Sequence, residues 1–122
     1  MKHEYLRELF SEENMIFPYG EKDYHGFDER DTFNMDYTLI AWLYECLRYF
    51  QDKASKVVKL DYKERLFNVD DKELTLRQCI DRMVEDCKYI LLDDADYDFK
   101  TLNVYKDDLF KVLSECFWAM WW

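Results

Sequence analysis

The sequence has few of the residues that interrupt regular secondary structure, with two glycines and one proline among 122 residues. This scarcity leaves few of the usual loop-forming residues and so argues against a loop-rich chain. Disorder over most of the length is disfavoured, because 49% of the residues are hydrophobic and 19% are aromatic. A chain of this length is typical of one compact domain. We expect residues 1–122 to fold as a single helical domain.

Long apolar runs are missing as well. No stretch approaches the roughly 18 apolar residues of a membrane span, and the opening Met-Lys-His-Glu-Tyr-Leu lacks the apolar stretch of a secretory signal. We expect a cytoplasmic protein that does not bind membranes. The four cysteines form no Cys-x-x-Cys pair, so we expect reduced, buried thiols instead of disulfides or a zinc site at Cys46, Cys79, Cys87 and Cys116.

The motifs of common enzyme classes are also absent. The sequence has no Gly-x-Ser-x-Gly elbow, no Walker loop and no Gly-x-Gly-x-x-Gly. A thiol enzyme needs an activated cysteine beside a histidine, but the cysteines fall on apolar stripes and the histidines are His3 and His25. We expect no catalytic residues, no cofactor and no bound metal.

Acidic residues dominate the charge. The chain carries 27 acids and 17 bases, for a net charge of −10. Residues 1–33 hold nine acids and four bases, and residues 70–105 hold ten acids and five bases, so each stretch has a net charge of −5. Such a surface repels nucleic acid and attracts basic partners. The alternative is that the acids only keep an aromatic-rich protein in solution.

Apolar residues at steps of three and four predict long amphipathic helices over about 35–53, 75–92 and 104–121. The first follows Asn34, a natural N-cap. Its predicted buried stripe is Met35, Leu39, Trp42, Leu43, Cys46, Leu47 and Phe50. The second opens with Thr75-Leu76-Arg77-Gln78, which matches a capping box. The third follows Asn103, and its predicted buried stripe is Leu109, Val112, Leu113, Cys116, Phe117, Met120 and Trp121.

A short helix over Glu4 to Phe10 completes the predicted fold, which is mainly all-α: a small antiparallel helical bundle. Residues 56–69 stay unassigned because their signals conflict. Val57, Val58, Leu60 and Tyr62 favour a strand, whereas Leu66-Phe67 favours a turn of helix.

The chain ends in Phe117-Trp118-Ala119-Met120-Trp121-Trp122, and three indoles within five residues cannot share one helical face. At least one of them therefore lies outside the buried stripe. It either covers the N-terminal segment or forms the wall of a pocket or protein interface, where tryptophan is enriched.

The stretch from Tyr19 to Tyr37 gathers both glycines, His25 and many carboxylates before a helix N-terminus. Asp31 and Asp36 fit a capping role there, because helix N-termini attract anions. In this reading Arg30 pairs with neighbouring acids and holds the loop to the bundle.

Two hypotheses that give the stretch from Tyr19 to Tyr37 a function remain open. One is a Zn, Mn or Fe site in a metal-dependent enzyme, with the ligands Asp23, His25, Asp28 and Asp31. The other is a phosphate or nucleotide site, where Arg30 and Asn34 contact the phosphate and the base stacks on Tyr24, Phe27, Phe33 or Tyr37.

A second acidic cluster, Asp93-Asp94-Ala95-Asp96-Tyr97-Asp98, resembles the start of a calcium loop. Counted from Asp94, however, Phe99 stands where glycine is needed and Tyr105 where glutamate should chelate, which excludes an EF-hand. The cluster is either a solvated loop or an acidic surface that binds a basic protein.

Two segments, Gly26-Phe27-Asp28-Glu29-Arg30-Asp31-Thr32-Phe33-Asn34-Met35-Asp36-Tyr37-Thr38 and the closing Phe117–Trp122, resemble a family of small bacteriophage and prophage proteins of no assigned activity. They cover about a sixth of the chain, which departs from the family over residues 54–70. The resemblance implies a viral origin. By analogy with other small acidic viral proteins, it implies binding to a host protein.

We therefore expect a non-enzymatic binding protein, monomeric or homodimeric in the host cytoplasm, that engages and inhibits a basic host protein of the defence or nucleic-acid-enzyme class. The candidate binding residues are Asp28, Arg30, Asp31, Asn34, Asp36, Tyr37, Asp94, Asp96, Asp98, Trp118 and Trp122. The alternative function is a nucleotide sponge with an aromatic pocket near Arg30, Asn34, Tyr37 and Trp118. The metal-dependent enzyme is the less favoured third hypothesis.

Overall fold

The computed structural model describes residues 4–9, 35–54, 66–92 and 98–120. The elements follow the chain in the order α1 (Glu4–Leu9), α2 (Met35–Ala54), β1 (Leu66–Val69), β2 (Lys72–Thr75), α4 (Leu76–Leu92), α5 (Phe99–Cys116) and the 3-10 turn η3 (Phe117–Ala119). Helices make up 84% of the described residues, which confirms the mainly α fold class.

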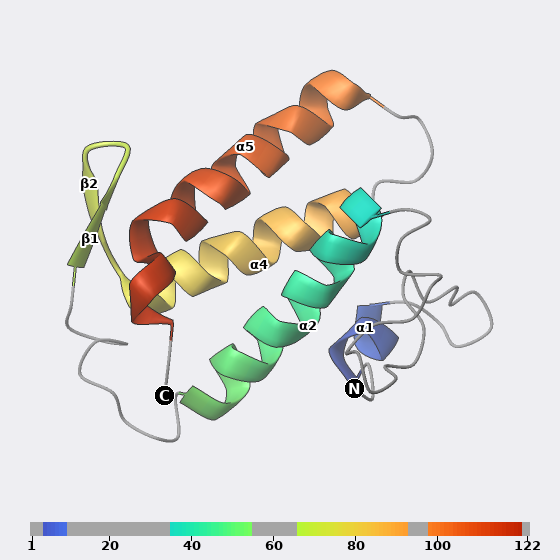
Figure 1. The fold of residues 1–122 in the computed structure, drawn as a ribbon, viewed down its shortest axis with the longest axis horizontal. Helices are drawn as coiled ribbons and strands as arrows, with labels where there is room; N and C mark the ends of the chain where they lie inside the picture. The colour runs from blue at the N-terminus through green and yellow to red at the C-terminus, as the bar shows by residue number, and fades with distance from the viewer. Residues whose placement is uncertain (1–3, 10–34, 55–65, 93–97, 121–122) are drawn as a thin grey trace.

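α4 is the central helix of the bundle. In Figure 1 it lies between α2 and α5, and its direction is antiparallel to that of α5. Its fully buried side chains recur at steps of three and four and include Leu76, Cys79, Ile80, Met83 and Cys87. The buried residues of the neighbouring helices are Ile40, Ala41, Tyr44 and Leu47 in α2, and Leu109, Val112 and Cys116 in α5. One face of α4 therefore supplies the core shared by both neighbours.

The start of α4 confirms the predicted capping box. The backbone N–H of Gln78 donates to Thr75 Oγ1 at 3.2 Å, and the backbone N–H of Thr75 donates to Gln78 Oε1 at 2.9 Å. Two N–H groups that no helical carbonyl can reach are thereby satisfied. The cap sets the boundary between β2 and α4.

The predicted range of α2 is confirmed, but its predicted buried stripe is wrong in part. Met35, Leu39 and Trp42 are exposed, whereas Ile40, Ala41 and Tyr44 face the core. The helix carries apolar residues on most of its circumference, so periodicity alone does not select the buried side. Contact with α4 makes that selection.

The third predicted helix starts earlier and ends earlier than expected. Asp98 caps α5, with its Oδ1 accepting the backbone N–H of Thr101 at 3.4 Å, so Asn103 lies inside the helix. After Cys116 the backbone tightens into η3, which turns Phe117 outward to half exposure. Phe117 therefore does not belong to the buried stripe.

Part of the unassigned segment is a strand. β1 pairs antiparallel with β2, with Leu66 opposite Thr75 and Val69 opposite Lys72. Of the conflicting signals that left this segment unassigned, the helical turn at Leu66-Phe67 does not form, because Phe67 and Val69 alternate inward with the period of a strand. Residues 56–65, including the possible strand from Val57 to Tyr62, lie outside the described residues.

The hairpin turn has an unusual composition. Asp70 and Asp71 have φ of 53° and 63°, the left-handed values that a two-residue type I′ turn requires. Asn-Gly is the preferred pair there because most side chains are strained at positive φ. Asp70 is held in place by Arg82 and Lys111, but Asp71 has no such partner among the described residues.

We predict that Asp71→Gly stabilises the protein by roughly 0.5–1 kcal/mol, because glycine removes the strain of positive φ. Thermal or urea unfolding measures the effect. The control is Lys72→Gly, one residue into β2, which should destabilise the protein by a similar amount. A loss of stability in Asp71→Gly would contradict the turn geometry.

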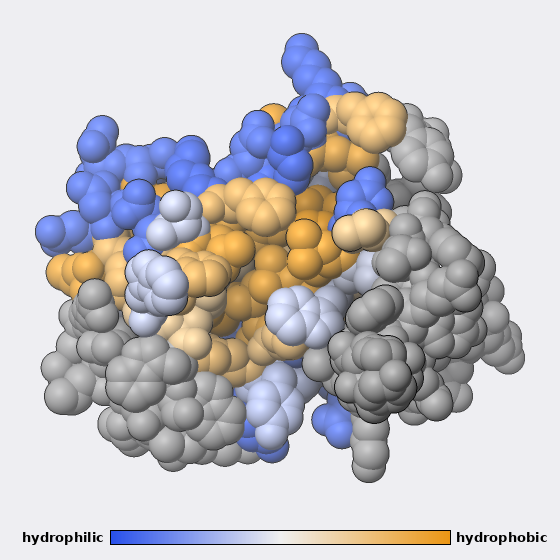
Figure 2. All heavy atoms as spheres, viewed as in Figure 1, coloured by the Kyte–Doolittle hydropathy of each residue, from blue (hydrophilic) through white to orange (hydrophobic). Residues whose placement is uncertain are grey.

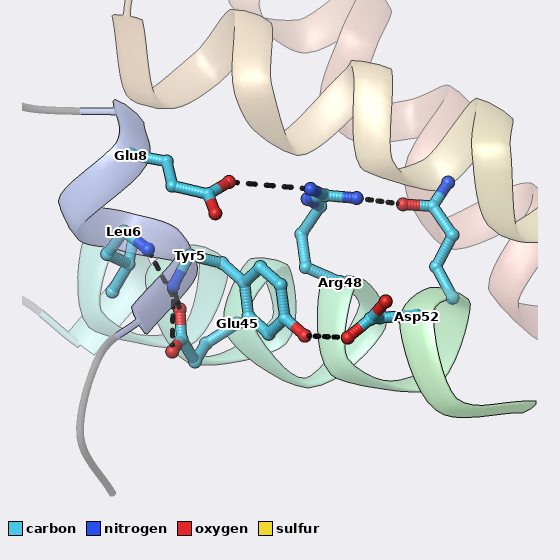
Figure 3. Close-up of polar contacts among 7 residues, drawn as sticks. Tyr5, Leu6, Glu8, Glu45, Arg48 and Asp52 are labelled. Carbon is cyan, nitrogen blue, oxygen red and sulfur yellow. Dashed lines mark hydrogen bonds and ion pairs between the residues drawn. The ribbon is translucent and has the colours of Figure 1, made fainter.

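α1 confirms the short N-terminal helix and is docked on α2 by a buried carboxylate (Figure 3). Glu45 of α2 is only 4% exposed and accepts the backbone N–H groups of Tyr5 (3.2 and 3.1 Å) and Leu6 (2.9 Å). These groups lie in the first turn of α1, where no helical carbonyl can bind them. Glu45 thus caps α1 from a different helix.

Polar contacts extend from this cap to α4. The Tyr5 hydroxyl donates to Asp52 at 3.0 Å, and Arg48 lies 5.0 Å from the centre of the Tyr5 ring (Figure 3). Burial and the Asp52 carboxylate raise the pKa of Tyr5 to about 12. Arg48 also donates to Gln51, whose amide donates to Asp81 of α4 at 2.6 Å. α1, α2 and α4 are therefore joined by one set of hydrogen bonds.

We predict that Glu45→Ala lowers the free energy of unfolding by about 1–3 kcal/mol, because two buried N–H groups lose their acceptor. Hydrogen exchange at Tyr5 and Leu6 should accelerate in parallel. Glu8→Ala, which removes an exposed partner of Arg48, is the matched control and should change stability by less than about 0.5 kcal/mol. Equal stability of the two variants would refute the capping role.

The bundle leaves apolar surface uncovered. On the face in Figure 2, apolar side chains form a continuous area over the middle of the molecule, while hydrophilic residues lie mainly along its upper edge. No helix in the described ranges combines the length and apolar character needed to cross a membrane. Exposed apolar area of this kind is typical of interaction surfaces.

The cysteine prediction is confirmed for burial at three positions. Cys79, Cys87 and Cys116 are buried, whereas Cys46 is half-buried, and all four are free thiols. Burial raises the pKa of Cys46 to about 11 and that of Cys87 to about 12. These two thiols are therefore poor nucleophiles at neutral pH.

Candidate functional site

The candidate site is a hollow at the C-terminal end of α5, which we call the α5 hollow. It is open to solvent, has a volume of about 340 Å³ and is lined by Phe110, Leu113, Ser114, Phe117 and Trp118. α5 places these side chains together because residues three and four apart lie on the same side of a helix. Phe117 and Trp118, which belong to η3, complete the lining, and both are exposed to solvent.

Two aromatic rings form a corner of the hollow. The rings of Phe117 and Trp118 meet edge to face, with centroids 4.9 Å apart and planes at 88°. Trp118 is 87% exposed, so its ring is open to a ligand. A hollow with perpendicular aromatic walls suits a flat or apolar group of a partner, and tryptophan is the residue most enriched at binding hot spots.

Two of the three lysines of α5 are paired within the chain. Lys106 lies 2.9 Å from Asp107, and Lys111 lies 2.9 Å from Asp70 of the hairpin turn. Glu115, which follows Ser114, is exposed and has no ion-pair partner in the described part of the chain. Within α5, Glu115 is therefore an unpaired carboxylate, and Lys100, at the opposite end of the helix from the hollow, is an unpaired cation.

A second polar cluster joins α4, α5 and the hairpin. Arg82 of α4 donates to Asp108 of α5 through Nε (2.9 Å) and through a second nitrogen, and also to Asp70 at 3.2 Å. The two carboxylates raise the pKa of Arg82, and Arg82 lowers the pKa of Asp108. These charge-assisted contacts fix the hairpin and α5 relative to α4.

Asp86 is the unusual member of this cluster. It is 6% exposed and hydrogen-bonds Asp108, and its Oδ2 has no partner among the residues that the structure describes. Burial, together with the neighbouring Asp108 carboxylate, raises the pKa of Asp86 to about 8. The group is therefore protonated at neutral pH and donates to Asp108. Within the described residues, no group of acids, histidines and cysteines is arranged to hold a metal ion.

We predict that Asp86 makes the protein less stable as the pH rises from about 4 to about 8. The unfolded carboxyl loses its proton near pH 4, whereas the folded one keeps it up to about pH 8, so folding is linked to proton uptake over this range. Asp86→Asn should remove this slope and raise stability at pH 8 by at least ~1 kcal/mol, the equivalent of one pKa unit.

Urea unfolding at several pH values measures this linkage. Glu85→Gln, at the exposed neighbouring position, is the control and should keep the slope of the parent protein. An unchanged slope in Asp86→Asn would show that Asp86 is ionised in the folded state.

The described candidate residues are spread over the bundle. Asp36 is exposed at the start of α2 and accepts the backbone N–H of Tyr37 at 2.8 Å. Tyr37 is half-buried against the core, and burial raises its pKa. Asp98 acts as the cap of α5, and its hydrogen bonds from Thr101 lower its pKa. Trp118 alone among these described candidates lines the hollow.

The other candidates lie outside the described residues: Asp28, Arg30, Asp31, Asn34, Asp94, Asp96 and Trp122, as do the proposed metal ligands Asp23 and His25. Of the expected nucleotide pocket, Tyr37 and Trp118 are described. Figure 1 shows the start of α2 and η3 at opposite ends of the bundle, so these two residues do not share a pocket.

Sequence reasoning missed Phe110, Leu113, Ser114 and Phe117 as site residues. Periodicity places Leu113 and Phe117 in the predicted buried stripe. A signal was present, because Phe99, Phe110 and Phe117 are spaced by eleven and seven residues and therefore share one side of the helix, beside the stripe. Comparisons with protein families, curated proteins and solved structures find no match to this chain.

Proposed function

We propose that this chain is a phage-encoded, non-enzymatic binding protein that engages and inhibits a basic host protein through its acidic surface and the α5 hollow. The observation that carries the proposal is the exposure of Trp118 and Phe117 beside a hollow on a rigid helix. Leaving large aromatic rings in water is unfavourable, and their burial against a partner supplies binding free energy.

The charge of the chain supports a basic partner. The net charge is −10. Among the described residues, the exposed acids Asp71, Glu73, Glu85 and Glu115 have no ion-pair partner. In the same described ranges the exposed bases Lys72, Arg77, Lys88 and Lys100 are also unpaired, so the support comes from the net charge of the chain. A net charge of one sign accelerates association with a partner of opposite sign and contributes to specificity. Proteins that handle nucleic acid present such basic surfaces, which is consistent with a target of the defence or nucleic-acid-enzyme class.

The same charges disfavour a nucleotide at the hollow. A phosphate needs cationic or N–H donors, but Lys106 and Lys111 already pair with Asp107 and Asp70. We therefore favour a protein partner over the nucleotide sponge.

Affinity capture from a bacterial host lysate tests the proposal. We expect the chain to retain a basic protein, and Phe117→Ala with Trp118→Ala to reduce capture at least tenfold, because hot-spot residues contribute roughly 2 kcal/mol or more. Capture should also decrease between about 0.05 M and about 0.5 M salt, since exposed charges are screened.

The matched control is Val104→Ala, which removes an exposed apolar side chain of α5 that does not line the hollow. It should capture the partner as the parent does. Equal capture by the double variant, or capture independent of salt, would contradict the proposal.

A further inference from the structure

We infer that the α5 hollow binds an arginine side chain of the protein partner. The inference rests on the proposed function and deepens it, because it names the group that the hollow receives. Three observations carry it: the perpendicular rings of the hollow, the ion pairs that already hold Lys106 and Lys111 of the same helix, and the net charge of −10.

The geometry of the rings suits a guanidinium. Trp118 is open to solvent and Phe117 stands at 88° to it, so a planar cation can stack on the indole while its edge faces the second ring. Tryptophan is the strongest aromatic partner of a cation, and arginine stacks better than lysine because its charge is planar and weakly hydrated. In the described part of the chain, the cation–π contacts are Arg48 with Tyr5 and Lys53 with Tyr49, and none involves Trp118.

The remaining lining suits the rest of the side chain. Phe110 and Leu113 offer apolar surface to the methylene stem of an arginine, which is commonly buried while the charged end stays in water. The Ser114 hydroxyl can accept a guanidinium N–H. Glu115, the next residue in the sequence, carries a negative charge that no cation of the described chain pairs with.

The charge pattern selects arginine over other occupants. A second copy of the chain would bring another net charge of −10, and a nucleic acid or nucleotide would bring phosphates; both are repelled. A neutral apolar side chain would fill the hollow but would not be attracted by the negative charge of the chain. An arginine has an apolar stem for the lining and a positive charge that this negative charge attracts.

The test is a titration of the full chain, followed by NMR of the tryptophan indole N–H signals. The probes are acetyl-Gly-Arg-Gly-Arg-Gly-amide and the same peptide with citrulline, which keeps the shape of arginine but lacks its charge. We expect the Trp118 signal to shift with the arginine peptide, and the citrulline peptide to bind about two- to fivefold more weakly, the fold-change that corresponds to ~0.5–1 kcal/mol for an exposed cation–π contact.

Two variants separate stacking from general charge attraction. Trp118→Leu keeps apolar volume and, at an exposed position, should keep the fold, which circular dichroism checks; it should remove most of the preference for arginine over citrulline. Trp42→Leu replaces a tryptophan on α2, away from the hollow, and should leave the preference unchanged.

Equal binding of the two peptides, an unchanged preference in Trp118→Leu, or a larger Trp118 shift with adenosine monophosphate would overturn the inference. If the hollow binds neither peptide while Phe117→Ala with Trp118→Ala still reduces partner capture, the arginine inference is wrong and the binding function stands. If capture is also unaffected, both are wrong.

Discussion

The packing of α4 against α2 on one side and α5 on the other is the interaction on which the rest of the structure depends. α4 holds the largest set of fully buried side chains, including Ile80 and Met83, and no other described helix contacts both neighbours extensively. Burial of apolar surface is the main favourable term in folding. The packing of α2 and α5 against α4 therefore determines where α5, the hairpin and the hollow lie.

The same constraint explains why aromatic residues remain outside. α5 packs on α4 through Leu109, Val112 and Cys116, and it is fixed further by the contacts of Arg82 with Asp108 and Asp70. A helix attached along one side leaves its other side to solvent. Phe110, Phe117 and Trp118 lie on that free part of α5 and η3, so a rigid helix presents the hollow. Binding sites on rigid elements lose less conformational entropy when a partner docks.

Sequence patterns predicted the features that depend on local spacing, and they failed where tertiary contacts decide. The three long helices and the Thr75 capping box follow from periodicity and a short motif. The buried side of α2 does not, because Met35 and Leu39 are as apolar as Ile40 and only the position of α4 distinguishes them. The start of α5 was placed too late because Asp98 was read as part of an acidic loop, although aspartate is also a preferred cap. The buried carboxyls of Glu45 and Asp86 carry no sequence signal of burial, since charged residues are rarely buried.

Native-state hydrogen exchange measures the role of α4 most directly, because it reports the free energy of opening for each helix. The amides around Ile80, Met83 and Cys87 should exchange only through global unfolding, and those of α1 should open at lower free energy. Exchange of the α4 amides at a free energy below that of α2 and α5 would contradict a fold organised around this helix.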